Sequence, residues 1–227
     1  PGIPEITQHA SVITGYNEDE KTILHYIQKG NQEGEQQEGA IPQDIFDREW
    51  SEEGRLLIIM APSDTLSGIV LENNSQDKSN RLCFNSEKLN ILKNSNEALA
   101  ALKQAIELDS NNSTALHLYG SMLNQQNSLD CVSFYERSLK INNKSYLTFN
   151  GLGNFYLKTN QFEKAENSYT KAIEINPKRS AKIYKNRAYI REKQNKNSDA
   201  KEDLKSYLKY FPKAPDRGII EQAIREI

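Results

Sequence analysis

The stretch Tyr146–Pro177, YLTFNGLGNFYLKTNQFEKAENSYTKAIEINP, decides the fold of the second half of the chain. It predicts two helices packed as a hairpin, with small residues, Gly153 and Ala165, where the helices cross, so that their axes approach closely. Four larger side chains fill the space around that crossing: Phe149, Leu152, Tyr156 and Tyr169. Pro177 ends the second helix because it lacks a backbone donor.

The same spacing recurs on both sides of this stretch, so the second half is a repeat. Downstream, the pattern continues at Tyr184, Ala188, Ala200, Leu204, Tyr207 and Pro212. Upstream, it is found at Leu116, Tyr119, Gly120, Leu123, Tyr135, Ser138 and Leu139, and earlier at Ala98, Leu102, Ala105 and Leu108. The first helix of the earliest unit, within residues 79–92, is degenerate. Three clear repeats and a poor first one are about the minimum for an independently stable stack.

The stretch Tyr146–Pro177, with the residues named above and Ala172, resembles a tetratricopeptide repeat at every signature position. The resemblance implies an all-α solenoid over residues 79–212. Residues 213–227 then predict a capping helix that begins at Pro215 and closes the end of the stack. Its apolar face consists of Ile219, Ile220, Ala223, Ile224 and Ile227.

Solenoids of this family bind peptides or proteins with a concave face formed by the first helices of the repeats. The family pattern places His117, Ser121, Asn124, Asn150, Asn154, Lys158, Lys182, Lys185, Asn186 and Tyr189 on that face. Asparagine amides pair with the backbone of an extended peptide, and lysines meet carboxylates. A clamp for C-terminal carboxylates is not expected, because only Asn154 and Lys182 match its positions and Gly151 replaces a required asparagine. The alternative is a solvated face in a purely structural stack.

Residues 1–73 lack the helical repeat and predict an α+β part. HASVITGY and KTILHYI form a predicted hairpin, followed by an acidic Gly/Gln-rich loop at Gly30–Gly39. A helix is expected from Pro42 to Gly54, and RLLIIMAP is expected to be a buried strand.

This order resembles the C-terminal half of a bacterial papain-like cysteine peptidase of the type that processes bacteriocin leaders at a double glycine. The resemblance implies that His9 is the general base for a cysteine thiolate. His25 or Tyr26 on the next strand takes the place of the residue that orients the imidazole, with Asn17 as a weak substitute. The nucleophile should precede the histidine, so Cys83 does not fit, and we expect the chain to begin partway through a domain. Cys131 is expected to be a small packed side chain in the repeats.

Composition excludes several classes of function. The formal charge of -2 offers no basic block for nucleic acid, and no apolar run approaches the length of a membrane span. The two cysteines lack metal-ligand spacing, and no cofactor or metal is expected.

Three interpretations remain. The first is a peptidase-like protein whose repeats bind a peptide or protein partner, which implies the bacterial envelope or periplasm. The second is an inactive peptidase-like fold within a binding scaffold. The third is a non-catalytic tetratricopeptide adaptor, which implies the cytoplasm.

Overall fold

The computed structural model describes residues 12–17, 22–28, 36–42 and 74–227. The described strands and helices belong to two separate compact units. The strands β1 (Val12–Asn17), β2 (Thr22–Gln28) and β3 (Gln36–Pro42) form an antiparallel sheet in the order β1-β2-β3. β1 and β2 pair as the predicted hairpin, and the register shifts between Ile13 and Gly15.

The third strand corrects two expectations about the N-terminal part. Residues 36–39, predicted to lie in a loop, belong to β3, and Pro42 ends this strand, where it pairs with Thr22, instead of beginning a helix. The polar QQEG run has little side-chain hydrophobicity, so the strand is defined by its backbone pairing with β2. Proline fits here because an edge strand tolerates a missing ladder donor. The helix and the final strand predicted within residues 43–62 lie outside the described residues.

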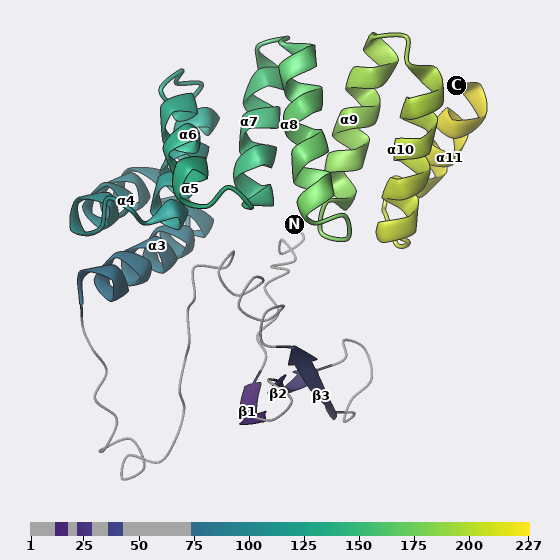
Figure 1. Cartoon of the computed structure of the whole chain (residues 1–227). Helices are drawn as coiled ribbons and strands as arrows, with labels where there is room; N and C mark the ends of the chain where they lie inside the picture. The colour runs from purple at the N-terminus through teal and green to yellow at the C-terminus, as the bar shows by residue number, and fades with distance from the viewer. Residues whose placement is uncertain (1–11, 18–21, 29–35, 43–73) are drawn as a thin grey trace. The chain divides into compact units, whose positions relative to one another are not determined.

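Residues 74–227 are helical, in agreement with the repeat prediction (Figure 1). The helices are α3 (Ser75–Ile91), α4 (Ser95–Leu108), α5 (Ser113–Gln125), α6 (Cys131–Ile141), α7 (Tyr146–Lys158), α8 (Phe162–Ile175), α9 (Ala181–Lys193), α10 (Asn197–Tyr210) and α11 (Arg217–Glu226). We call the pairs α3/α4, α5/α6, α7/α8 and α9/α10 repeats 1 to 4. The fold of the described C-terminal unit is therefore an all-helical solenoid.

The degenerate first helix of repeat 1 is in fact a regular helix, α3, that begins at Ser75 and not near residue 79. Its buried positions are the small residues Ser79, Cys83 and Ser86. Ser79 Oγ donates to the carbonyl of Ala105 at 2.7 Å. Because two of these buried positions are serines, the sequence of α3 lacks the apolar spacing that would have predicted the helix.

The turns inside the four repeats share one backbone conformation. A residue with positive φ follows each first helix: Lys93 (64°), Asn127 (60°), Asn160 (56°) and Asn195 (60°). The next residue donates its N–H to a carbonyl in the last turn of that helix, at 2.9, 2.9, 2.8 and 2.8 Å in repeats 1 to 4. This is the Schellman arrangement, in which asparagine tolerates the left-handed conformation better than lysine does.

The helix crossing in repeat 3 leaves no space for a side chain at Gly153. A Cβ atom added there would lie 2.4 Å from the ring of Tyr169, a residue that is fully buried. Ala165 and Ala172 on the second helix are also fully buried. The predicted role of small residues at this crossing is confirmed.

Three hydrophobic clusters form the solenoid core. The first joins α3, α4 and α5 through Cys83, Ala98, Leu102, Ala105, Ala115 and Met122. The second joins α6 and α7 through Cys131, Tyr135, Leu152 and Phe155. The third spans α7 to α11 and contains 14 buried residues, among them Tyr169, Ile173, Tyr184 and Leu204. The core is thus most extensive in repeats 3 and 4.

The capping helix α11 packs on this largest cluster, although it begins at Arg217, two residues after the predicted start. Ile220 is buried at 7% exposure, and Ala223, Ile224 and Ile227 pack beside it. Ile219 was placed on the same face, but it is 71% exposed. Consecutive helical residues point about 100° apart, and the packed stripe is narrow enough to exclude Ile219.

Candidate peptide-binding face

The residues predicted for the concave face lie on the first helices α5, α7 and α9. Within the described part of the chain, five of them are hydrogen-bonded to a neighbouring repeat: His117, Asn124, Asn154, Lys158 and Asn186. We call the ten predicted positions, from His117 to Tyr189, the first-helix face.

On α5, His117 lies in the junction between repeats 2 and 3. Its Nδ1 is 3.2 Å from the hydroxyl of Thr148, and its ring centroid is 5.9 Å from that of Tyr135. Burial lowers the pKa of His117 to about 4, so the imidazole is neutral at pH 7. Ser121, also on α5, lies beside the hydroxyl of Tyr135 on α6.

Asn124, Gly151 and Lys158 connect α5 to α7. The Asn124 side-chain amide donates to the carbonyl of Gly151 at 3.3 Å, and the backbone carbonyl of Asn124 accepts from Lys158 Nζ at 2.8 Å. A Cβ at Gly151 would lie 2.6 Å from the ring of Tyr135. The glycine that breaks the carboxylate-clamp pattern is therefore required for packing between the repeats.

Asn154 connects α7 to both α8 and α9. Its Oδ1 accepts from the hydroxyl of the buried Tyr169 at 2.7 Å and from Asn186 Nδ2 at 3.5 Å. This amide therefore positions a core tyrosine.

On α9, Lys185 donates to the Asp216 carboxylate at 2.7 Å and lies 5.3 Å from the centre of the Tyr207 ring. Hydrogen bonds from Lys185 and from the Tyr207 hydroxyl lower the pKa of Asp216. Tyr189 is 48% exposed, with Lys193 Nζ 5.4 Å from its ring centre.

Two predicted positions, Asn150 and Lys182, make no hydrogen bond or ion pair to any other described residue. Lys182 is exposed and Asn150 is half-buried. Together with the exposed Tyr189, they are the residues of the first-helix face whose side chains make no hydrogen bond within the described stack.

An ionic network behind this face was not predicted from the sequence. Arg187 makes two hydrogen bonds to the Asp203 carboxylate, at 2.9 and 2.7 Å, and Arg191 donates to the same carboxylate at 3.0 Å. Arg191 also pairs with Glu166 at 2.9 Å, and Lys196 pairs with Glu166 at 2.6 Å. Burial opposes ionisation of Glu166, but the hydrogen bonds from Lys196 and Arg191 outweigh it and lower its pKa.

Two residues of the sequence could have predicted this network. Arg187 and Arg191 occupy the positions that Leu152 and Tyr156 fill in repeat 3. Arg187 is only 8% exposed and Asp203 only 3%. Two arginines at core positions of one helix predict a buried acidic partner, because an unpaired buried charge is costly.

The described residues contain no group of histidine, cysteine and acidic side chains that could hold a metal ion. His9 lies outside the described residues, and His25 lies in β2, where it pairs with Ile13. Burial, with the nearby Glu87 charge, raises the pKa of Cys83 to about 12, which keeps the thiol protonated. Cys131 is fully buried, as predicted, and burial raises its pKa too.

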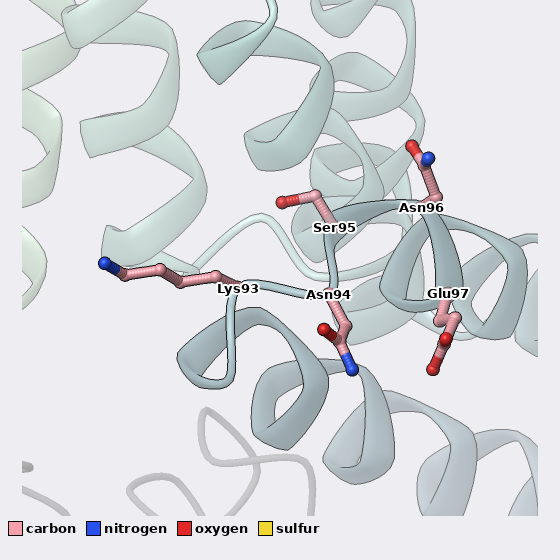
Figure 2. A pocket seen from close by; sticks show the side chains of 5 residues that line it. All are labelled: Lys93, Asn94, Ser95, Asn96 and Glu97. Atoms are coloured by element: carbon pink, nitrogen blue, oxygen red, sulfur yellow. The ribbon is translucent and has the colours of Figure 1, made fainter.

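A pocket of about 330 Å³ lies away from the first-helix face, at the turn that leads into α4. Figure 2 shows that its lining side chains, from Lys93 to Glu97, point in different directions. They do not converge on a common point, so the pocket offers no defined chemistry. No helix among the described residues is both long and apolar enough to span a bilayer.

Comparison with known proteins identifies the repeats. Residues 146–179 and 89–112 each match a family model described as tetratricopeptide repeat. No curated protein matched the chain. The chain therefore contains tetratricopeptide repeats, as predicted, whereas the peptidase resemblance of residues 3–62 gained no support.

Solved structures share the solenoid fold. PilF of Pseudomonas aeruginosa is 15% identical with a TM-score of 0.61, over 67% of this chain and 71% of PilF. A MamA structure is 20% identical with a TM-score of 0.54, over 60% of this chain and 79% of MamA. At these identities the likeness concerns the fold alone.

Proposed function

We propose that the helical unit is a protein-interaction adaptor that binds an extended polypeptide on the first-helix face. The proposal rests on the presence of two groups of side chains on this face, one hydrogen-bonded within the stack and one without such partners. Asn124, Asn154 and Lys158 hold neighbouring repeats together, while the side chains of Asn150 and Lys182 have no hydrogen-bond or ion-pair partner among the described residues. The first group fixes the surface, and the second group remains available to a ligand.

This arrangement favours binding because a fixed surface loses little conformational entropy when a ligand docks. The Asn150 amide has the donors and the acceptor that pair with a peptide backbone. Tyr189 offers a rigid amphipathic ring, a side chain that is frequent where partners meet. Repeats of this family commonly bind proteins or peptides, which is consistent with an adaptor.

The peptidase interpretation has no support from the described residues. It depends on His9, which lies outside the described residues, and on a nucleophile for which neither described cysteine is suited. Cys83 and Cys131 are both buried, and the pKa of each is raised. The adaptor interpretation has direct support from the repeats and from the organisation of their first helices.

A peptide selection tests the proposal. The full chain is used to select binders from a random dodecapeptide phage library, and synthetic versions of the selected peptides are titrated against two variants. Asn150→Trp fills the first-helix face, whereas Glu174→Trp places the same ring on an exposed position of the second helix α8. We expect at least about a tenfold loss of affinity, near 1.4 kcal/mol, with Asn150→Trp only.

Circular dichroism spectra of both variants check that the solenoid remains folded. Equal affinity for the wild type and Asn150→Trp would contradict binding on this face. So would an equal loss of affinity in the two variants.

A further inference from the structure

The charge of the first-helix face rises sharply from α5 to α9. At pH 7 the positions on α5, His117, Ser121 and Asn124, are uncharged, because burial holds the pKa of His117 at about 4. On α7 the residues are two asparagines and Lys158. The sequence of α9, AKIYKNRAYIREK, carries five basic residues and one acidic residue, Glu192.

The wider region is also basic. Residues 178–213 contain 12 lysines and arginines against 4 aspartates and glutamates, although the whole chain has a formal charge of -2. Arg187 and Arg191 are compensated by Asp203 and Glu166 behind the face. Among the lysines on the front of α9, Lys185 pairs with Asp216, and Lys182 and Lys193 have no acidic partner among the described residues.

Those lysines form a stripe along α9. Lys182, Lys185, Tyr189 and Lys193 follow one another at intervals of three or four residues, so they share one side of the helix. Lys182 and Lys193 are exposed, and Lys193 lies over the ring of Tyr189 at 5.4 Å. We call these four residues the basic stripe.

The structure already holds one carboxylate on this stripe. Asp216, in the turn before α11, accepts from Lys185 at 2.7 Å and from the Tyr207 hydroxyl at 2.6 Å. The carboxylate that Lys185 binds is therefore a side chain within the chain and not a chain terminus. The stripe is thus able to bind acidic side chains of a polypeptide passing over it.

We propose that the basic stripe recognises an acidic internal segment of a partner polypeptide, so that the partner's acidic part lies over α9 and its neutral part over α7 and α5. This inference rests on the proposed function and specifies the partner chemistry and its direction. A polypeptide fits better than a flat anionic surface, because the stripe is one helix wide and continues into the amide side chains of α7. Lys182 and Lys193 supply the free charge, and Tyr189 supplies an aromatic contact between them.

The test uses fluorescein-labelled dodecapeptides titrated against the full chain. One peptide contains six glutamates separated by serines and alanines, with acetylated and amidated ends; a second has glutamine in place of each glutamate; a third is the first with a free C-terminal carboxylate. We expect the two glutamate peptides to bind equally and at least about fivefold more tightly than the glutamine peptide. The advantage should shrink between 50 and 300 mM salt, because exposed charges are screened.

Two double variants remove the same charge from different surfaces. Lys182→Gln with Lys193→Gln should weaken binding of the capped glutamate peptide at least about fivefold. Lys201→Gln with Lys205→Gln on α10 should leave its affinity unchanged. Equal binding of the glutamine peptide, a requirement for the free terminus, or equal effects of the two double variants would overturn the proposal.

A parallel titration with phosphatidylserine-containing vesicles tests whether the basic stripe binds an anionic membrane surface instead of a polypeptide. Vesicle binding that depends on Lys182 and Lys193, without binding of the glutamate peptide, would also overturn the proposal. Failure of this inference is distinct from failure of the proposed function. If library-selected peptides still lose affinity with Asn150→Trp while the glutamate peptide shows no preference, the face binds peptides without selecting acidic ones.

Discussion

Repeats 1 and 2 share the frame of repeats 3 and 4 but are held together differently. The N-terminal pair relies on one small apolar cluster in α3 to α5, on a second that joins α6 to α7 of repeat 3, and on neutral hydrogen bonds, such as the one from Asn112 to Ser79 at 2.9 Å. The C-terminal pair has a 14-residue cluster and the Arg187–Asp203 ionic network. A single repeat pattern therefore fixes the path of the chain, whereas the residues between repeats determine how firmly each helix is held.

This difference bears on function because the proposed binding residues lie on the firmly held side. The guanidinium of Arg187, on α9, is fixed to α10 through Asp203 and to α8 through Thr170, at 2.9 Å. Arg191, one turn later, pairs with Glu166 on α8. The basic stripe on the other side of α9 is thereby held in place.

The largest expected effect comes from breaking the network. Asp203→Ala leaves Arg187 and Arg191 without their shared carboxylate, and we expect a loss of about 3–5 kcal/mol in the free energy of unfolding. Urea denaturation followed by circular dichroism measures it. The control is Glu202→Ala, whose exposed pair with Lys205 should contribute less than about 1 kcal/mol. Equal losses in the two variants would contradict a structural role for the network.

Overpacking a crossing should have the next largest effect. Ala172 is fully buried on α8, and Ala172→Leu should cost about 1–3 kcal/mol because the core has no space for the added carbons. The neighbouring Lys171 is exposed, and Lys171→Leu serves as the control. An unchanged urea midpoint in Ala172→Leu would refute the repeat frame.

The junction of repeats 2 and 3 should respond to pH through His117. An unfolded histidine has a pKa near 6.5, whereas burial lowers the folded value to about 4, so the unfolded chain binds the proton more tightly. The contribution of His117 to the free energy of unfolding is therefore fully present above pH 6.5. It is lost as the pH drops towards 4, by about 1–3 kcal/mol. Thermal melts at pH 7 and 5 should differ less in His117→Asn than in the wild type.

The network of repeats 3 and 4 has a separate pH window. The pKa of Glu166 is lowered, so its contribution is present above about pH 4.5 and is lost as the pH falls through the folded value. Identical pH slopes in the wild type and His117→Asn between pH 7 and 5 would contradict the assignment of the earlier change to His117.

The smallest effect is a stabilisation of repeat 1. Lys93 has a φ of 64°, where repeats 2 to 4 have asparagine. Lys93→Gly should remove the strain of the left-handed conformation and stabilise the chain by about 0.5–1 kcal/mol. The same change at Lys103, within α4, should destabilise the helix by about 1 kcal/mol. A destabilised Lys93→Gly variant would show that this turn is not strained.

The sequence predicted the solenoid because the repeat frame depends on residue size at fixed spacing. Gly153, Ala165 and Tyr169 each perform the role expected from their positions. It did not predict α3 in full, since Ser79 and Ser86 replace apolar residues there. It also missed β3, whose polar residues are ordered by backbone pairing with β2.

The repeat frame predicted the helices on which the candidate residues lie, but it did not predict their hydrogen-bond partners. The family pattern located Asn154 and Lys185 on the first helices, where they lie. Their hydrogen bonds to Tyr169 and Asp216 depend on neighbouring helices, and a pattern within one repeat carries no information about those partners. The same holds for Arg187, whose partner Asp203 is 16 residues away on α10.

Hydrogen exchange of the full chain, measured by mass spectrometry with and without the capped glutamate peptide, tests the central claim that the firmly held half is the binding half. We expect the amides of α7 to α10 to exchange more slowly than those of α3 and α4 in the free chain. We also expect the peptide to add protection in α9 and α7. Uniform exchange along the solenoid, or added protection confined to α3 and α4, would contradict this claim.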